Sequence, residues 1–251
     1  MKERAAQPTA RGREPLWTAG FFGILLVNFL LFFAFQMVMP VIPVYVRGPL
    51  RGSDVDVGLL SGIFTVAAVA ARPFTGLLLD RTGRRPTLLG GMLVFALGIY
   101  GYGLAGGIAA LALFRVVHGL GFAGVSTATS TIAADVVPAA RRNEGLGYFG
   151  LSTTLSAAFA PTIGFWLADR YSFPALFKVS VLCSFAALAL ALRLKVRAAG
   201  REGPVYQEEP TRRKEAPAAS DRGARHGPAA LWRLLFEPAA LPAALMMLVM
   251  T

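Results

Sequence analysis

Runs of about 20 or more apolar residues alternate with short polar links along most of the chain. A helix of that length crosses the hydrocarbon core of a bilayer, so each run predicts a membrane-spanning helix. Six runs are long enough: 17–46, 57–79, 87–106, 108–135, 145–168 and 174–194. A further apolar run, 238–251, has only 14 residues and is too short to span. The pattern predicts an all-α polytopic membrane protein.

The positive charges are concentrated in alternate links. The chain is 55% hydrophobic and has a net charge of +11. Four Lys or Arg residues precede Leu16, three lie in the 80–86 link, two in the 138–144 link and ten in 193–233. Because cytoplasmic loops collect Lys and Arg, we expect a multi-pass protein of the plasma membrane (a cell inner membrane) with a cytoplasmic N-terminus. The basic charge therefore reflects topology, and no nucleic-acid partner is expected.

Composition divides the chain into four parts. Residues 1–16 form a basic cytoplasmic tail, and residues 17–194 form the six-helix domain. Residues 195–237 are rich in Pro, Gly, Glu, Arg and Ala, which is typical of a flexible cytoplasmic linker. We expect the apolar stretch that closes this linker to form a short interfacial helix. Residues 238–251 would begin a seventh span.

The link between the second and third runs has an unusual charge pattern. Residues 76–88 read G-L-L-L-D-R-T-G-R-R-P-T-L. Asp80 would lie at the C-terminal end of a helix, where the macrodipole disfavours a carboxylate, so it needs a cationic or helix-N-terminal partner. Gly83 supplies the left-handed backbone that a tight turn requires. The candidate cationic partners are Arg81, Arg84 and Arg85.

From Gly76 onward this link resembles the loop G-x-L-x-D-R-x-G-R-[RK] between spans 2 and 3 of the major facilitator superfamily of transporters. The resemblance implies the N-terminal six-helix half of such a transporter, built from two inverted three-helix repeats, plus the start of span 7. A missing C-terminal six-helix half is then expected as a partner. A faint internal repeat agrees, because Pro73-x-x-Gly76 recurs 88 residues later as Pro161-x-x-Gly164. In the family mechanism Asp80 and its arginine partners would lock the outward-facing state.

The fourth run contains an arginine and a histidine. An arginine at the centre of a membrane helix costs about 2.5–3.5 kcal/mol on insertion scales, so it is by default functional or paired. Helical spacing places several residues on one face that we expect to line a polar cavity: Arg115, His118, Gly119, Phe122, Ser126 and Thr129. His118 has no companion metal ligands, so a hydrogen-bonded packing role is the simpler expectation and no metal site is predicted.

The segment Arg115-x-x-x-Gly119-x-Gly121 resembles the span-4 motif of proton-coupled members of the family. The resemblance implies that Arg115 takes part in proton transfer or holds an anionic group. The alternative is that Arg115 bonds carbonyls or side chains within its own bundle. Both interpretations remain open at the level of sequence.

The first run contributes Asn28 and Gln36 as further cavity candidates but contains no carboxylate. Several drug–proton antiporters of the family carry an acidic residue in this span. If the intact protein exchanges protons, its key carboxylate is expected in the missing half.

The fifth run contains Gly150 and then Ala160-Pro161-x-x-Gly164. This resembles the antiporter motif of exporters, G-x8-G-x3-G-P-x2-G-G, although Ala160 and Phe165 replace two of its glycines. A Gly/Pro pair weakens the helical hydrogen-bond ladder and lets the helix bend, which is useful in alternating access. The same glycines also suit close helix packing.

We therefore expect a secondary active transporter, closest in motifs to the drug/proton antiporter-like exporters, which moves a small organic molecule by alternating access. The alternatives are a six-span half-transporter that acts as a homodimeric carrier or channel, and an inactive fragment. The chain contains no Walker loop, which argues against an ATP-driven pump, and no G-x-S-x-G motif, which argues against an intramembrane hydrolase. No cofactor is expected, and membrane lipid is the surrounding partner.

Overall fold

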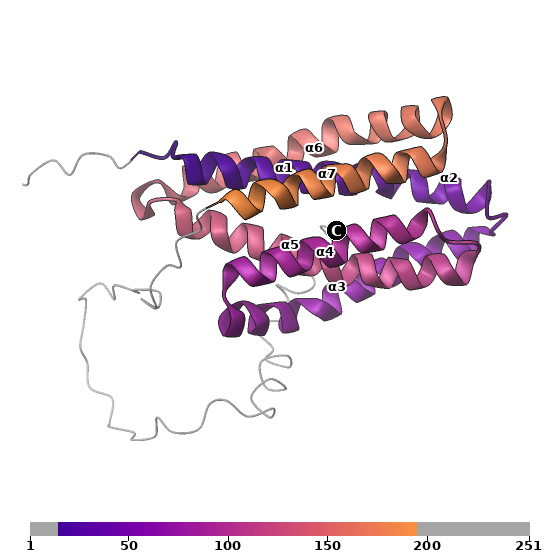
Figure 1. The fold of residues 1–251 in the computed structure, drawn as a ribbon, viewed down its shortest axis with the longest axis horizontal. Helices are drawn as coiled ribbons and strands as arrows, with labels where there is room; N and C mark the ends of the chain where they lie inside the picture. Colours follow the sequence, from indigo (N-terminus) through magenta and orange to yellow (C-terminus); the bar gives the residue numbers. More distant parts are fainter. Residues whose placement is uncertain (1–14, 195–251) are drawn as a thin grey trace, which may run out of the picture. The chain divides into compact units, whose positions relative to one another are not determined.

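The computed structural model describes residues 15–194 as a bundle of long helices (Figure 1). The first span consists of α1 (Ala19–Val38), a short 3-10 turn η1 (Met39–Val41) and α2 (Ile42–Arg47). The others are α3 (Asp54–Thr82), α4 (Arg84–Tyr102), α5 (Ile108–Val136), α6 (Arg142–Arg170) and α7 (Phe173–Arg193), with the turn η2 (Ala139–Arg141) before α6. The expected linker 195–237 and the start of a seventh span lie outside the described residues.

The six helical segments coincide with the six predicted spans, and local signals explain where several begin. The Thr18 side chain accepts a hydrogen bond from the backbone N–H of Phe21 at the start of α1. Ser53 and Asp56 form a capping box at the start of α3. Ser172 caps α7 in the same way as Thr18 caps α1. These caps bind backbone N–H groups that have no partner within the helix.

The third span is shorter than predicted. It ends at Tyr102 rather than near residue 106, because glycines at 103, 106 and 107 disfavour a helix. Within the described residues, five helical segments are long and apolar enough to cross a membrane by length and composition, and α4 is not one of them. Its first residues are Arg84 and Arg85, and its C-terminal half is rich in Gly and Tyr.

The outer surface of the bundle is apolar. Phe22, Val66 and Leu182 are each more than 60% exposed. Such a surface is unfavourable in water but matches the hydrocarbon core of a bilayer. The described part of the chain is therefore an all-α, multi-pass membrane bundle.

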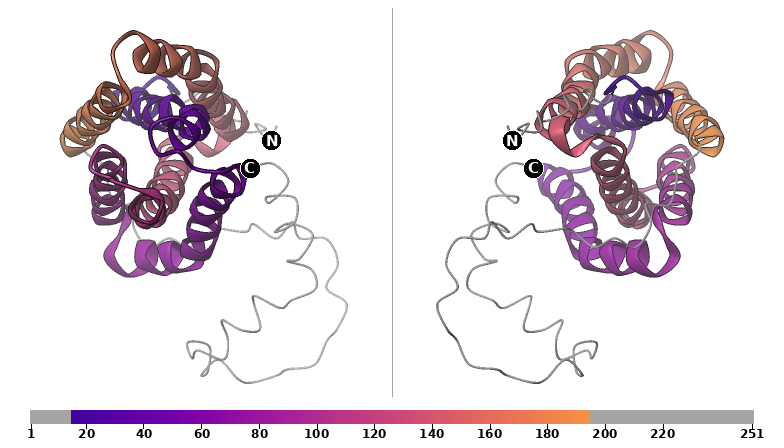
Figure 2. Two further views of the ribbon diagram at one scale, coloured as in Figure 1. Left: turned by 90° about the vertical axis from the view of Figure 1, so that its right-hand side faces the viewer. Right: turned by 90° about the vertical axis from the view of Figure 1, so that its left-hand side faces the viewer.

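Helices α1 and α5 hold the bundle together. Helix α1 packs mainly on α6 and α7, whereas α5 packs mainly on α3 and α4, and α1 touches α5. If α1, α3 and α4 are exchanged with α5, α6 and α7 in that order, the contacts of α1 with α6 and α7 become the contacts of α5 with α3 and α4. The end-on views in Figure 2 show the helices running side by side. This exchange pattern is what two three-helix repeats related by a two-fold axis produce.

Small residues set the distance between neighbouring helices. A Cβ on Gly121 of α5 would lie 2.3 Å from the backbone nitrogen of Phe95 on α4, and one on Gly98 of α4 would lie 2.5 Å from Cα of His118. Neither contact is possible for a real Cβ, so α4 and α5 approach this closely only because glycine occupies both positions.

Candidate functional site

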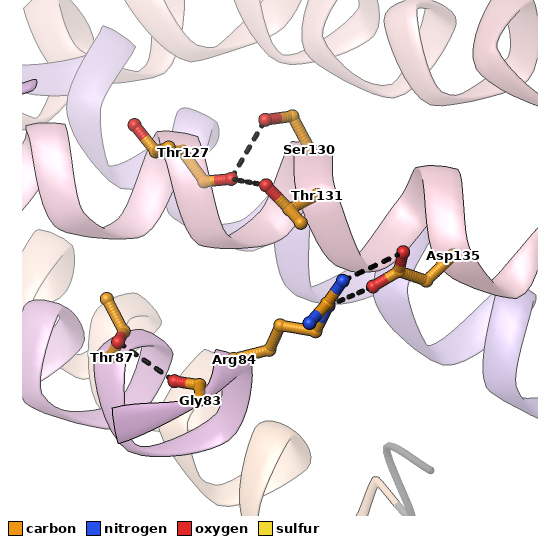
Figure 3. Close-up of polar contacts among 7 residues, drawn as sticks. All are labelled: Gly83, Arg84, Thr87, Thr127, Ser130, Thr131 and Asp135. Atoms are coloured by element: carbon orange, nitrogen blue, oxygen red, sulfur yellow. Dashed lines mark hydrogen bonds and ion pairs between the residues drawn. The ribbon is translucent and has the colours of Figure 1, made fainter. Parts of the chain in front are cut away.

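The 76–88 link is a tight turn between α3 and α4, and Gly83 is the residue that makes it. Gly83 ends α3 with φ +91° and ψ 169°, a conformation that is essentially restricted to glycine. The predicted positive φ is confirmed, although ψ is extended rather than left-handed helical. The Thr87 hydroxyl donates to the Gly83 carbonyl at 2.9 Å, which fixes the first turn of α4 (Figure 3).

Arginines of the link bind two other helices. Arg84 forms a bidentate ion pair with Asp135 near the C-terminus of α5, and both side chains are partly buried (Figure 3). Arg85 donates from Nη2 to the Leu192 carbonyl at 2.7 Å, near the C-terminus of α7. A cation is favourable there because the last carbonyls of a helix carry partial negative charge. The link therefore connects α3 and α4 to the adjacent ends of α5 and α7.

This arrangement changes the expected partners of Asp80. Sequence suggested that the neighbouring arginines serve this carboxylate, but Arg84 and Arg85 bind elsewhere because their helix start points toward α5 and α7. Asp80 and Arg81 are exposed in the last turns of α3, and Asp80 forms no ion pair with a described residue. Gly76 has no neighbour within 4 Å on its Cβ side. The Asp80 carboxylate is thus exposed and accessible to a partner.

Arg115 is buried within α5, with 1% of its surface exposed. Its Nε donates to the Leu60 carbonyl of α3 at 3.0 Å, and Nη1 lies 3.1 Å from the sulfur of Met39. Its guanidinium carbon is 4.8 Å from the centroid of the Phe64 ring, a cation–π distance. No carboxylate pairs with it among the described residues. The guanidinium therefore joins α5 to α3 and to the α1–α2 junction.

His118 lies one turn further along α5 and is fully buried. Its Nδ1 is 2.7 Å from the hydroxyl of Tyr102, the last residue of α4. The predicted hydrogen-bonded environment is present on one ring nitrogen, while Nε2 has no partner. The imidazole is surrounded by aromatic rings: Phe35, Phe64, Phe95 and Tyr102.

The predicted polar face of α5 is buried at several positions and half-buried at others. Gly119 and Thr129 are buried, and a Cβ on Gly119 would lie 2.7 Å from the Phe64 carbonyl of α3. Phe122 stacks on Phe35 of α1 with centroids 4.4 Å apart. Ser126, which is half-buried, is directed back to the Ala123 carbonyl of its own helix. Gly119 thus packs against α3 and Phe122 against α1, whereas Phe122 and Ser126 keep part of their surface exposed.

Asn28 connects α1 to α6. It is fully buried, and its Nδ2 donates to the hydroxyls of Ser152 at 2.9 Å and Thr153 at 3.0 Å. Ser156 adds a bond from its hydroxyl to the Phe29 carbonyl of α1 at 2.9 Å. Gln36, the other candidate in the first span, is half-buried on α1. Asn28 thus serves helix association, and one acceptor atom, its Oδ1, remains without a partner.

Most hydroxyls of α5 and α6 bond back to their own helix, as expected. Ser130 and Thr131 both donate to the Thr127 carbonyl (Figure 3), and Thr154 donates to the Gly150 carbonyl. Such bonds satisfy a hydroxyl inside an apolar environment without a second helix.

The glycines of α6 differ from each other. Helix α6 continues from Arg142 to Arg170 through Pro161. A Cβ on Gly164 would lie 2.3 Å from the Met37 carbonyl oxygen of α1, whereas one on Gly150 would meet nothing within 4 Å. Gly164 is thus a packing glycine, and Gly150 lies on an open side of the helix.

Tyr102, Asp135 and Met39 complete the contacts of the candidate residues, and sequence reasoning did not assign these roles. Each lies at the end of a helical segment, where its position relative to another span depends on the turn that follows. Asp135 could have been found from its charge opposite the basic link. The described residues contain no group of three His, Cys, Asp or Glu side chains suited to a metal ion.

Comparisons with known proteins agree with this architecture. The chain matches the family described as Major Facilitator Superfamily over residues 24–251. It is similar to the quinolone resistance protein NorA of Staphylococcus aureus, with 29% identity over 142 residues that cover 56% of this chain and 36% of NorA. It is also similar to an uncharacterized MFS-type transporter of Mycobacterium tuberculosis, with 30% identity over 179 residues, 71% of this chain and 25% of that protein. The matches therefore span well under half the length of these relatives.

Solved structures show the same fold. The peptide transporter POT in complex with sulfate superposes with a TM-score of 0.66 at 21% identity, covering 74% of this chain and 40% of that one. A POT family transporter in complex with 5-aminolevulinic acid gives a TM-score of 0.63 at 18% identity, covering 71% and 39%. Since the family match covers nearly the whole sequence and the helical bundle has the fold of solved transporters, this chain belongs to the Major Facilitator Superfamily.

Proposed function

We propose that the protein works as a secondary active transporter that exports a small organic molecule in exchange for protons by alternating access. The observation that carries the proposal is the 76–88 link. Its turn glycine, its ion pair with α5 and its bond to the end of α7 tie four helices together at one end of the bundle. Such a connection suits a bundle that rocks as a unit.

Export is favoured over import by two features. The chain is similar to NorA, which is named a quinolone resistance protein. In addition, α6 carries the Pro161-x-x-Gly164 segment of the exporter motif. We therefore place the substrate among small organic molecules of the drug type and the 76–88 link on the cytoplasmic side, in keeping with its positive charge.

In this proposal the exposed Asp80 is the gate. Because Arg84 and Arg85 hold the link against α5 and α7, the Asp80 carboxylate is left at the surface of α3 for a helix N-terminus of a second six-helix half. This contact would close the cytoplasmic side in the outward-facing state and break when the substrate is loaded from inside. Arg115 would serve coupling, and α6 would bend at Pro161.

The test is Asp80→Asn in cells that express the complete coding sequence. Efflux of a fluorescent quinolone is expected to be lost, with the amount of protein in the membrane unchanged on an immunoblot. Asp169→Asn is the matched control, since Asp169 is also exposed, also precedes an arginine and lies in the last turn of α6. Normal efflux by Asp80→Asn contradicts the gate. If the unaltered protein exports no compound of a drug panel, or exports it equally with a protonophore present, the proposed function is wrong.

A further inference from the structure

One nitrogen of a fully buried histidine has no hydrogen-bond partner. His118 is 0% exposed, its Nδ1 is bound to the Tyr102 hydroxyl at 2.7 Å, and its Nε2 is unpaired. A polar atom left unpaired in an apolar interior costs about 1–3 kcal/mol. An aromatic or aliphatic side chain would fill the same space without that cost, which His118 shares with Asn28 and Ser180 among the described residues.

The imidazole lies among aromatic rings from three other helices. Ring centroids lie 4.6 Å away for Phe95, 5.1 Å for Phe64 and 6.0 Å for Phe35. The aromatic neighbours of His118 are Phe35 of α1, Phe64 of α3, and Phe95 and Tyr102 of α4, and Arg115 lies one turn away on α5. Tyr45 of α2 does not contact His118 through a hydrogen bond, but its hydroxyl donates to the backbone carbonyl of Tyr102 at 3.4 Å.

The interior of the described bundle offers no carboxylate for a proton. The acidic residues of residues 15–194 all lie at helix ends: Asp54, Asp56, Asp80, Asp135, Glu144 and Asp169. Histidine is the side chain whose charge ordinarily changes near neutral pH. Among the described residues, His118 is therefore the one group inside the bundle suited to gain and lose a proton under physiological conditions.

We propose that His118 is the proton-binding residue of this half of the transporter, an inference that rests on the proton exchange proposed above. The proton binds to whichever ring nitrogen has no hydrogen, so that the imidazolium donates from both. Tyr102 can accept from Nδ1, but Nε2–H then needs an acceptor that the aromatic cage lacks, and Arg115 repels the new charge. In the closed cage the imidazolium would therefore have an unpaired Nε2–H near a cationic side chain.

Proton binding requires the cage to open. When α3 or α1 moves away from α5, water reaches Nε2 and solvates the imidazolium. When the cage closes again, the proton must leave. The conformational change and the proton are thereby coupled through the contact of Phe35 and Phe64 with His118, and the energy of desolvating the charged form is what couples them.

The test compares transport driven by a pH gradient with substrate exchange that needs no gradient. Proteoliposomes containing the complete transporter are loaded with a quinolone that the unaltered protein exports. His118→Gln keeps a hydrogen-bonding group for Tyr102 but cannot titrate. Transport driven by an imposed pH gradient is expected to be lost, whereas exchange of labelled for unlabelled quinolone at equal pH is retained. Ser180→Ala, which alters another buried polar residue with an unpaired atom, should leave both unchanged.

A second variant covers the case in which His118→Gln fails to fold. Tyr102→Phe keeps the imidazole but removes the acceptor of its charged form. A hydrogen bond from an ionised donor is about twice as strong as a neutral one, so the midpoint of the pH dependence should move to lower pH. Gradient-driven transport by His118→Gln, or an unshifted midpoint in Tyr102→Phe, overturns the inference. If the unaltered protein transports but ignores the pH gradient, the proposed proton exchange fails instead.

Discussion

The contact between α1 and α6 gives the sharpest prediction about packing. In Gly164→Ala the new Cβ would lie 2.3 Å from the Met37 carbonyl oxygen, whereas ordinary contacts begin near 3.4 Å. The two backbones must therefore separate by about 1 Å, because the obstructing atom belongs to a helix backbone and cannot rotate away. Overpacking of this kind costs about 1–3 kcal/mol.

Gly150→Ala is the matched control on the same helix. Its Cβ meets nothing within 4 Å, and alanine favours a helix over glycine by about 1 kcal/mol. For a domain of this size, 1 kcal/mol shifts the unfolding midpoint by about 2–4 °C. Because both variants gain the same helix propensity, we expect the midpoint of Gly164→Ala to lie about 2–12 °C below that of Gly150→Ala.

The single cysteine of the chain provides the measurement. Cys183 is partly buried in α7, so a maleimide dye that fluoresces on reaction reports its exposure as the protein is heated in detergent. A midpoint for Gly164→Ala equal to or above that of Gly150→Ala would refute the packing argument. If Gly150→Ala is stable yet loses transport, the glycine serves bending of α6. Normal transport by that variant would leave Pro161 as the source of any bend.

Three further substitutions test other contacts. Gly83→Ala should cost about 1–3 kcal/mol, because its φ of +91° suits only glycine, whereas Gly76→Ala, inside α3 with nothing within 4 Å of its Cβ, should raise the midpoint as Gly150→Ala does. Arg84→Asp should destabilise the protein, and adding Asp135→Arg should recover about 0.5–1 kcal/mol of coupling, since the pair is only partly buried; strict additivity in the double-mutant cycle would contradict the ion pair. Asn28→Ala removes one buried and one partly buried hydrogen bond and should lower stability by about 1–3 kcal/mol, and an unchanged midpoint would disprove that role.

The spans could be predicted from sequence because their signal is local. An apolar run must be helical inside a bilayer, since no water is present to bond its backbone groups. The end of α4 was the least accurate boundary. Its predicted limit followed apolar residues such as Leu104 and Ala105, whereas the helix stops at Tyr102 because glycines dominate the following residues. Apolar content and helix propensity disagree there, and propensity decides.

The partners of the candidate residues could not be predicted in the same way. Asp80 and Arg84 are neighbours in sequence, but the turn at Gly83 directs Arg84 toward Asp135, 51 residues away. Likewise, helical spacing placed Arg115 and Gly119 on one face of α5 correctly, yet it could not indicate that α3 covers that face. Pairing between helices depends on their rotation and depth, and a single sequence carries little information about either.

The central helices α1 and α5 each carry a buried polar side chain that binds a neighbouring helix, and the two side chains lie toward opposite ends of the bundle. Asn28 lies nine residues into α1 and binds α6, and Arg115 lies seven residues into α5 and binds α3. Helices α1 and α5 are the first and fourth spans, so they begin at opposite ends of the bundle. Each buried polar contact lies about 10–14 Å from the start of its helix, and the two contacts are therefore on opposite sides of the middle of the bundle. Exchange of the repeats relates α1 to α5 and α6 to α3, so the contacts are counterparts. One is neutral, with the amide nitrogen of Asn28 bound to two hydroxyls, whereas the other is cationic and lies one turn from His118, whose Nε2 has no partner. Under the proposal made for His118, a change in protonation would act on the α3–α5 contact and leave the α1–α6 contact unchanged.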